Sequence, residues 1–236
     1  YFVRIPLKKS AHIVMGNALR MDWCDVVTPE RLSYIIGNPP FVGTHFMSED
    51  QRQDANLALE GVASAGLLDY VCCWYLKAAR YLAEPSPLPQ EAGRPRGAHV
   101  GVAFVSTNSI TMGEQVGVLW RALLPMGCKI RFGHRTFVWS NEARGKAAVH
   151  CVIIGFGLGD VQRKTIFHYP DPKGEALALS ATNINPYLVD ARDILLSRRD
   201  RPLLQAPRMF SGNQPIDEGH YLFTPEEKVT FLAMEP

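Results

Sequence analysis

The chain of 236 residues is long enough for one or two domains, and its 47% hydrophobic content supplies enough apolar side chains for a sizeable core. The formal net charge of +2 excludes a polycation, so any binding of nucleic acid must depend on a local basic face. No apolar run approaches the roughly 18 residues that a membrane span needs. Five cysteines without a CxxC pair favour reduced thiols in a cytosolic protein over a zinc site. Because the sequence starts in mid-pattern at Tyr1, we expect a piece of a larger protein.

The first predicted elements are two strands and two helices. His12–Met15 is typical of a strand, and the apolar run Ser33–Gly37 predicts a buried strand that an Asn-Pro-Pro sequence stops. Ser48 followed three residues later by glutamine fits a capping box, so a helix should begin there. A second helix is predicted over Leu67–Leu82, where apolar residues at spacings of three and four form one stripe. The stripe consists of Leu68, Val71, Tyr75, Ala79 and Leu82.

The next elements continue an alternation of strands and helices. Glu84–Ala98 is rich in proline and glycine and predicts an exposed loop, and His99–Val105 predicts a second buried strand. Thr107 and the two residues after it offer caps for a helix that runs to about Leu124. Two further strands are expected near 129–133 and 148–156, and they should pair antiparallel because no helix separates them. The pattern as a whole predicts an α/β protein with a largely parallel sheet.

Beyond Gly159 the periodic pattern weakens, and prolines interrupt it repeatedly. This region is typical of a loop-rich unit, so we expect a domain boundary near residue 160. Residues 1–160 would form one domain, and residues 161–236 would form a linker and the start of another.

The motif Asn38-Pro39-Pro40-Phe41 directly follows the predicted strand at 33–37, where open α/β sheets bind ligands. Its side chains suit the methylation of an exocyclic amine, which is a poor nucleophile because its lone pair is delocalised into the ring. The Asn38 side-chain oxygen and the Pro39 carbonyl could accept hydrogen bonds from that amine, and the prolines restrict the backbone that presents them. Phe41 would stack on the base, which must be flipped out of a duplex to reach the motif. The alternative is a rigid loop that merely ends a strand.

The motif resembles the catalytic motif of class I amino-methyltransferases. Longer strings resemble the MmeI-like restriction–modification enzymes, from about residue 12 to the end of the chain. These strings are IIGNPPFVG, GLLDYVCCWYLKAARYL, STNSI and HRTFVWSNEARGKAAVHCVIIGFG. The resemblance implies the C-terminal half of a Rossmann-like class I methyltransferase sheet with an antiparallel final strand pair, followed by the start of a target-recognition region. It further implies adenine-N6 methylation of double-stranded DNA with S-adenosylmethionine as the methyl donor, in the bacterial cytoplasm.

By the same resemblance, the cofactor's adenine would lie near Asn17, Ala18 and Asp22. Asn17 would be its polar partner, and Ala18 would lie against its ring. The alternatives are that Asn17 belongs to a turn after the strand at 12–15, and that Asp22 only caps a helix. The glycine-rich turn and the ribose-binding acidic residue of this enzyme class are absent, so the chain should carry half a cofactor site and be inactive alone.

Related enzymes also place an aromatic ring against the flipped base in the region of Phe137 and Trp139, with Phe137 the better candidate. Arg144 and Lys146 flank a glycine in a polar loop, which suits contact with DNA phosphates. The alternatives are core packing for the rings and solvated surface charge for the cations. The proposed mechanism requires neither Asp69, interpreted as a helix or network residue, nor His45, interpreted as a loop residue.

Several arginines near the end of the chain could follow a DNA backbone. They are Arg192, Arg198, Arg199, Arg201 and Arg208. Rival interpretations are methylation of a protein glutamine or an RNA base, and a DNA-binding module without activity. The long segment after the predicted sheet favours DNA over the first two, and the intact motif at Asn38 argues against the third.

Overall fold

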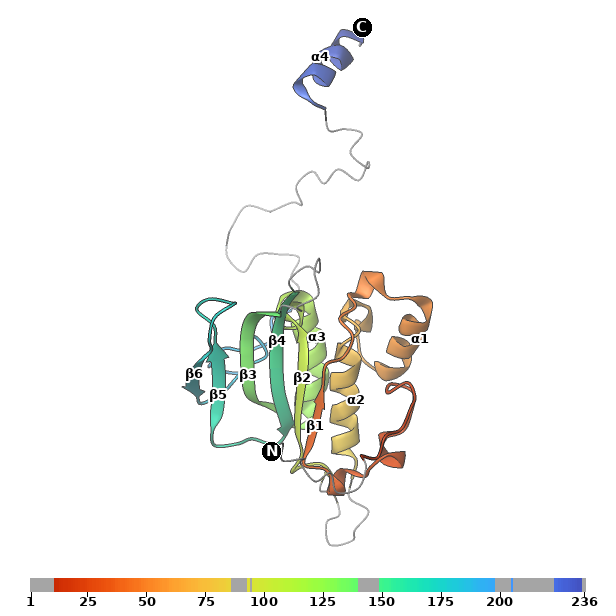
Figure 1. Cartoon of the computed structure of the whole chain (residues 1–236), viewed down its shortest axis with the longest axis vertical. Coiled ribbons are helices and arrows are strands. Elements are labelled where there is room, and N and C mark those ends of the chain that lie inside the picture. The colour runs from red at the N-terminus through yellow and green to blue at the C-terminus, as the bar shows by residue number, and fades with distance from the viewer. Residues whose placement is uncertain are drawn as a thin grey trace, which may run out of the picture. The chain divides into compact units, whose positions relative to one another are not determined.

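The computed structural model of the chain describes residues 11–85, 93, 95–139, 149–197, 205 and 223–234. These fall into two compact units, residues 1–197 and residues 198–236. The first unit is an α/β fold built on a six-stranded sheet (Figure 1). The second unit contains helix α4 (Pro225–Met234), whose first turn is capped by Thr224 and Glu227 through reciprocal hydrogen bonds. No helix in the described parts of the chain is long and apolar enough to cross a membrane.

The strand order in the sheet is β1-β2-β4-β3-β5-β6. β1 (Tyr34–Gly37) pairs parallel with β2 (Gly101–Thr107), as predicted. β3 (Cys128–Trp139) and β4 (Val149–Leu158) form the predicted antiparallel pair, and β4 lies between β2 and β3. The sheet continues with β5 (Lys164–His168) and β6 (Leu177–Ala181).

The two strands β5 and β6 lie beyond residue 160, where the sequence pattern had suggested a boundary. β5 pairs parallel with β3, and β6 pairs antiparallel with β5, so the first compact unit extends to Ser197. Both strands are only five residues long, and prolines and glycine occupy the turn between them, which is why the sequence showed no clear period here. The role of residues 161–236 as linker and target-recognition region stays a prediction.

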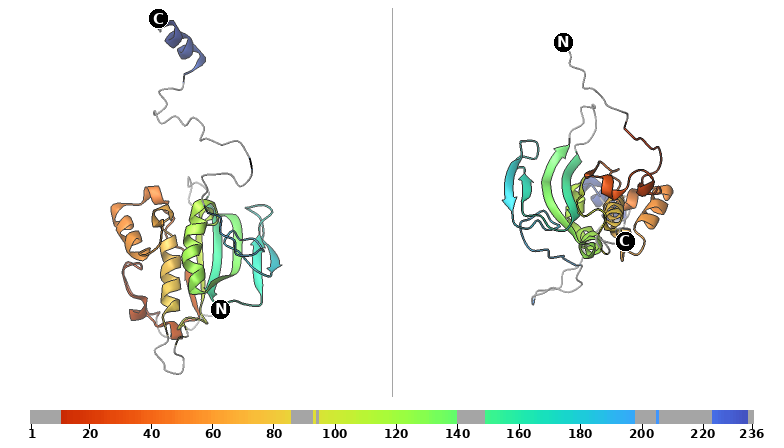
Figure 2. Two further views of the ribbon diagram at one scale, coloured as in Figure 1. Left: turned by 180° about the vertical axis from the view of Figure 1, so that it is seen from behind. Right: turned by 90° about the horizontal axis from the view of Figure 1, so that it is seen from below.

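Three helices pack in the first unit: α1 (Glu49–Ala58), α2 (Cys72–Ala83) and α3 (Gly113–Leu123). The capping box at Ser48 and Gln51 is present with both of its hydrogen bonds. α2 and α3 lie on one face of the sheet (Figures 1 and 2). The core between them is aromatic, with Tyr75 of α2 stacked on Phe156 of β4 at a centroid distance of 5.4 Å. All five residues of the predicted apolar stripe are buried.

One predicted element is absent, and two helices begin later than predicted. Residues 11–15 form no strand, and Ile13 and Met15 are exposed. α2 begins at Cys72 and not at Leu67, because the backbone at Leu68 is extended. The helix expected from Thr107 is instead a 3-10 turn (Asn108–Thr111) followed by α3. An extended residue, Met112, separates the two, and α3 begins at Gly113, where φ is +65°.

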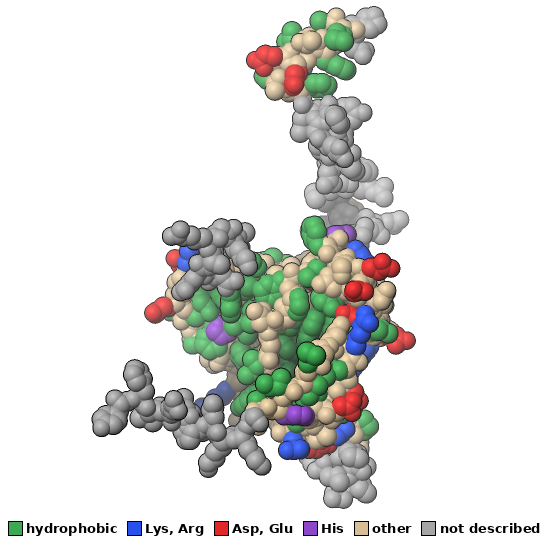
Figure 3. All heavy atoms as spheres, turned by 45° about the vertical axis from the view of Figure 1, so that its right-hand side comes forward, with side chains coloured by type: hydrophobic (Ala, Val, Ile, Leu, Met, Phe, Trp, Pro, Cys, Tyr) green, Lys and Arg blue, Asp and Glu red, His purple; other side chains and the backbone are tan. Residues whose placement is uncertain are grey.

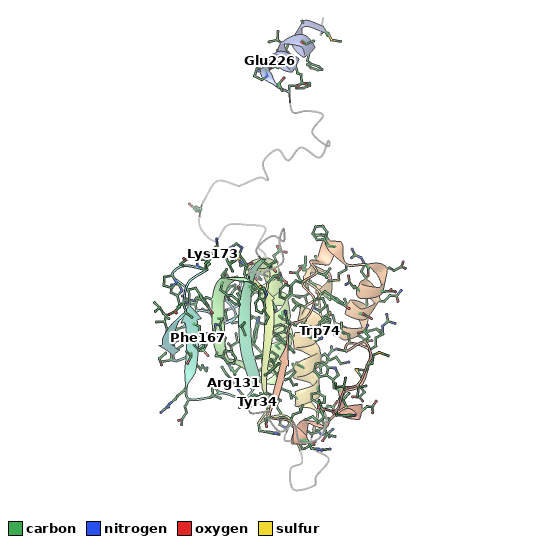
Figure 4. The ribbon with its side chains drawn as sticks, in the orientation of Figure 1. Tyr34, Trp74, Arg131, Phe167, Lys173 and Glu226 are labelled. Atoms are coloured by element: carbon green, nitrogen blue, oxygen red, sulfur yellow. The ribbon has the colours of Figure 1, made fainter. Side chains whose placement is uncertain are left out.

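The opposite face of the sheet is open among the described residues. Hydrophobic side chains gather over the sheet in Figure 3. Tyr34 and Ile36 of β1 are 72% and 79% exposed on this face. A cavity of about 350 Å³ on this face is lined by these two residues together with Arg131 and Phe132 of β3. Tyr34 and Arg131 are labelled at the lower end of the sheet in Figure 4. β1 is one of the two edge strands, so its outer side has no strand paired with it among the described residues.

Candidate active site

The edge of the sheet at the carboxyl ends of β1 and β2 gathers most of the predicted site residues. β1 and β2 run parallel, so the segments that follow them, from Asn38 and from Asn108, leave from the same edge. β4 is antiparallel to β2 and β3 is antiparallel to β4, so the end of β3 at Trp139 reaches this edge as well. The topology therefore brings the motif after β1 and the aromatic pair of β3 to one side of the fold.

The residues Asn38–Thr44 form a segment that we call the catalytic loop, after the role predicted for its motif. Asn38 directly follows β1 and is exposed, and its side chain makes no hydrogen bond to another described residue. Pro39 is buried, while Phe41 is half-buried. An anchored proline next to an exposed asparagine leaves the asparagine amide available to a ligand while the backbone beside it is fixed.

Glycine favours close strand packing where β1 enters this loop. A Cβ at Gly37 would lie 3.1 Å from the ring of Phe104, which is buried on β2. That distance is closer than a buried ring accommodates without moving, so the absence of a side chain lets β1 lie tightly against β2. The start of the catalytic loop is consequently fixed by strand pairing up to the residue before Asn38.

Two neighbouring residues hold the far end of the loop. The Tyr70 amide donates to the Val42 carbonyl at 2.9 Å, and the Thr44 amide donates to Asp69 Oδ1 at 3.0 Å. Asp69 Oδ2 also accepts from the Ser109 hydroxyl at 2.9 Å and from Gln115 Nε2 at 3.0 Å. His45 is exposed in the turn that follows, in agreement with its interpretation as a loop residue.

A buried carboxylate on α1 holds the residues Asn17–Asp22, which we call the cofactor loop after the role predicted for them. Asp54 Oδ2 accepts from Asn17 Nδ2 at 2.8 Å, and Asp54 Oδ1 accepts from Arg20 Nε at 2.5 Å. Burial disfavours the charged form of Asp54, but its hydrogen bonds from Arg20, Asn17 and Tyr70 outweigh that effect and lower its pKa. The loop is thus attached to the helix that follows the catalytic loop.

The side chain of Asn17 is therefore held in one orientation, and part of its hydrogen-bonding capacity is already engaged. Its oxygen accepts from the Leu19 amide at 2.9 Å while its nitrogen donates to Asp54, so the two ends of the amide cannot be exchanged. Ala18 is half-buried beside it, and its carbonyl accepts from the Trp23 indole at 2.8 Å. Asp22 caps a 3-10 helix (Trp23–Asp25) by accepting from the Cys24 amide, which is the structural role that the sequence had left open for it.

The predicted aromatic residues Phe137 and Trp139 lie side by side near the end of β3, with ring centroids 6.2 Å apart. A β-bulge between His134 and Phe137 places two residues of β3 opposite one of β4. This extra residue brings Phe137 to the same face as His134, and their rings are 6.4 Å apart. Phe137 also packs against Tyr169 at 5.3 Å, whereas Trp139 is 40% exposed at the strand end.

All but one of the remaining predicted DNA contacts are outside the described residues. They are Arg144 and Lys146, together with Arg198, Arg199, Arg201 and Arg208. Arg192 is described and is exposed. All five cysteines are free thiols, and no group of side chains in the described ranges could hold a metal ion.

Sequence reasoning missed the side chains that fix the two loops, namely Asp54, Tyr70, Ser109 and Gln115. One signal was present for Asp54, because it lies four residues before Ala58 and so falls on the buried face of α1. A carboxylate on that face needs partners from elsewhere in the chain. The other three are ordinary polar or amphipathic residues whose contacts depend on how the helices pack.

Comparison with known proteins shows the family to which the chain belongs. The sequence family described as "MmeI, DNA-methyltransferase domain" matches residues 2–168. DNA methyltransferase A of Bacillus subtilis (strain 168) is 34% identical over 234 residues, which is 98% of this chain and 25% of that protein. The type IIL restriction–modification enzyme MmeI, solved in complex with DNA, is 49% identical with a TM-score of 0.87 and covers 100% of this chain, which spans 30% of MmeI. The chain therefore belongs to the MmeI family of DNA-methyltransferase domains.

Proposed function

We propose that the full-length protein transfers a methyl group to N6 of an adenine flipped out of double-stranded DNA, as part of a restriction–modification enzyme. The observation that carries the proposal is the exposed Asn38 amide at the carboxyl end of β1, on a loop that is anchored at both ends. The family match and the DNA-bound structure of the 49% identical MmeI support DNA as the substrate. Adenine is inferred from the chemistry of the motif.

The catalytic loop would act by accepting hydrogen bonds. The Asn38 side-chain oxygen and the Pro39 carbonyl would each bind a hydrogen of the target amine, which favours a pyramidal nitrogen with a localised lone pair. The hydrogen bonds to these acceptors become stronger as positive charge develops on the nitrogen. They therefore stabilise the transition state more than the bound substrate and lower the barrier to methyl transfer. Phe41 would stack on the face of the base. Phe137 and Trp139 would contact the same nucleotide from the β3 side, and Arg144 and Lys146 would contact phosphates.

The residues of the cofactor loop fit one part of S-adenosylmethionine. The oxygen of Asn17 is held in a fixed orientation and has a second lone pair for an amino group, and the small Ala18 leaves room for a flat ring. When bound, S-adenosylmethionine supplies the electrophilic methyl group. Asp22 is engaged in its cap, so it would contribute to the cofactor site by fixing the loop.

We infer that a preceding part of the polypeptide completes the cofactor site and covers the open surface of the sheet. The outer side of β1 borders a cavity of about 500 Å³ whose lining includes Ile13, Trp23, Tyr34 and Ile36. An unpaired edge and an apolar face of this size are rarely left in water. Because this chain spans 30% of MmeI, the longer polypeptide has ample sequence to cover both.

The decisive experiment incubates the full-length protein with S-adenosylmethionine carrying a labelled methyl group and double-stranded DNA, followed by digestion of the DNA to nucleosides. Label in N6-methyl-2′-deoxyadenosine supports the proposal. Label in a methylated cytosine, or label transferred only to RNA or to a protein glutamine, would overturn it. The 236-residue chain alone should bind S-adenosylmethionine weakly or not at all by titration calorimetry, and a micromolar affinity would contradict the need for a preceding part.

A further inference from the structure

Asp69 and Tyr70 lie immediately before α2, where the catalytic loop, the cofactor loop and the end of β2 come together. We propose that this pair is a positioning junction that sets the catalytic loop against the cofactor loop during methyl transfer. The inference rests on the proposed function, and it assigns a role to two residues that the mechanism itself does not require.

On the side of the catalytic loop, the junction makes two hydrogen bonds to the backbone. Tyr70 donates its amide to the Val42 carbonyl, and Asp69 accepts the Thr44 amide. One bond fixes a carbonyl and the other fixes an amide two residues later, so the loop is held against translation and against rotation. Only the four motif residues lie between these bonds and the strand pairing at Gly37.

On the side of β2, Asp69 reaches the segment that leaves the neighbouring strand. The Ser109 hydroxyl donates to Asp69 Oδ2 at 2.9 Å and lies 2.7 Å from the Thr107 hydroxyl at the end of β2. Gln115 in the first turns of α3 donates to the same oxygen at 3.0 Å, and its own oxygen accepts weakly from the Asp69 amide at 3.4 Å. A single carboxylate thus connects the catalytic loop to two elements of the rigid core.

On the side of the cofactor loop, the connection runs through Tyr70. Its hydroxyl donates to Asp54 Oδ2 at 2.8 Å, the same oxygen that accepts from Asn17 Nδ2. Tyr70 is buried, and burial together with its bond to Asp54 raises the pKa of the phenol, so it remains a donor at neutral pH. An unbroken series of hydrogen bonds therefore runs from Asn17 through Asp54 and Tyr70 to the backbone of Val42.

Such a junction matters because methyl transfer requires the donor and the amine to meet in line. A misplacement of about 1 Å at a reacting centre can reduce the rate about a hundredfold, even when its cause is remote. Damage to Asp69 should therefore appear in the rate of the chemical step. Damage to the Tyr70 hydroxyl should appear mainly as weaker use of the methyl donor, since it loosens the attachment of Asn17.

The test compares two conservative variants of the full-length enzyme. Asp69→Asn keeps an acceptor for the Thr44 amide but sets an amide group against Gln115 Nε2, and we expect the single-turnover rate to fall about tenfold to a hundredfold with DNA affinity unchanged. Adding Gln115→Glu restores an acceptor opposite the new amide, and the rate should recover to within about threefold of the parent. Tyr70→Phe should raise the KM for S-adenosylmethionine several-fold with a small change in kcat.

Tyr75→Phe provides the matched control. It removes a buried hydroxyl from α2 that is 2.9 Å from the Ser106 hydroxyl and touches neither loop. Its melting temperature should fall about as much as that of Tyr70→Phe, while its KM and kcat stay those of the parent. Equal kinetic effects in the two variants would assign the change to stability and overturn the proposal.

Asn38→Ala distinguishes a failure of the proposed junction from a failure of the proposed function. If Asn38→Ala loses methylation while Asp69→Asn and Tyr70→Phe both behave like the parent, the junction is wrong and the proposed function stands. If Asn38→Ala methylates normally, the proposed function itself fails. Failure of the Asp69→Asn rate to recover on adding Gln115→Glu, in an enzyme that melts like the parent, would also overturn the junction.

Discussion

The ends of β1 and β3 reach the same edge of the sheet but are held by different forces. The loop after β1 is fixed by directional hydrogen bonds, among them those of Asp69 to the Thr44 amide and the Ser109 hydroxyl. The end of β3 is fixed by ring contacts, with His134 stacked on Phe167 at 4.2 Å and Phe137 against Tyr169 at 5.3 Å. Hydrogen bonds weaken steeply with angle, whereas ring pairs are stable over a broad range of separations. In the proposed mechanism, the acceptors that point at the amine thus lie on the rigid side, and the rings that cover the base lie on the more tolerant side.

The largest effect on the rate is expected from removing the acceptor on the rigid side. Asn38→Ala in the full-length enzyme should lower the single-turnover methylation rate roughly a hundredfold to a thousandfold, the usual loss for one preorganised contact to a transition state. DNA affinity by gel shift should stay nearly unchanged, because the contact strengthens only as the reaction proceeds. A rate within tenfold of the parent would restore the interpretation of this loop as a rigid strand ending.

Removing rings on either side should have smaller and less selective effects. Stacking on a base is worth about 1–3 kcal/mol, so Phe41→Ala and Phe137→Ala should each weaken capture of the flipped adenine about fivefold to a hundredfold, along with turnover. A fluorescent adenine analogue at the target position reports base flipping directly. If Trp139→Ala alone weakens capture, the more exposed ring is the one that contacts the base, and the preference for Phe137 is wrong.

The polar network should also give the domain a dependence on pH. The lowered pKa of Asp54 means that its charged form stabilises the fold above the ordinary value of 3.8, and that this stability is lost as the pH falls below it. Asp54→Asn should therefore cost about 1.5–3 kcal/mol at pH 7, the range for hydrogen bonds to a charged group. The difference in melting temperature between the parent and the variant should shrink progressively as the pH falls below 3.8. A constant difference across this range would show that the charge of Asp54 does not stabilise the fold.

The aromatic cluster around His134 should give the stability of the fold a weaker dependence on pH, which comes from a base that stays neutral and not from an acid that stays charged. Burial lowers the pKa of His134 below its ordinary value of 6.5, so the imidazole is neutral in the folded protein when it would already be protonated in the unfolded chain. Stability should fall as the pH drops through 6.5 towards the lower folded pKa. His134→Phe keeps the stacking with Phe167 and should remove this loss, a change of less than about 1 kcal/mol between pH 7 and 5. Identical melting profiles for the two proteins would refute it.

Local signals predicted the side of the site built on β1. A short apolar run stopped by Asn38-Pro39-Pro40 defines a strand and its end, and Ser48 with Gln51 defines a helix start without reference to the rest of the fold. The antiparallel pairing of β3 and β4 followed from the absence of a helix between them. Each of these depends on residues close together in the sequence.

The features that escaped prediction depend on distant partners. Asp69 is 25 residues from Thr44 and 40 residues from Ser109, so no local pattern shows that one carboxylate joins them. β5 and β6 are short and depend on pairing with β3 and with each other, so their composition alone does not mark them as strands. The bulges in β3 are invisible for the same reason, since a bulge exists only in relation to the strand opposite.

The bulge between His134 and Phe137 also changes how this strand must be compared with related sequences. Side chains of a regular strand alternate between faces, so odd and even positions are distinct, and a bulge exchanges the two classes once. Counting from His134, the alternation would place Thr136 on the open face, whereas the structure places Phe137 there. An alignment gap misplaced by one position across Arg135 and Thr136 would match Thr136 to the position of Phe137. The base-contacting role proposed for Phe137 would then be given to a residue on the other face of the sheet. Deleting one of these two residues should remove the bulge and restore regular alternation, which leaves Phe137 two positions after His134 and on the same face.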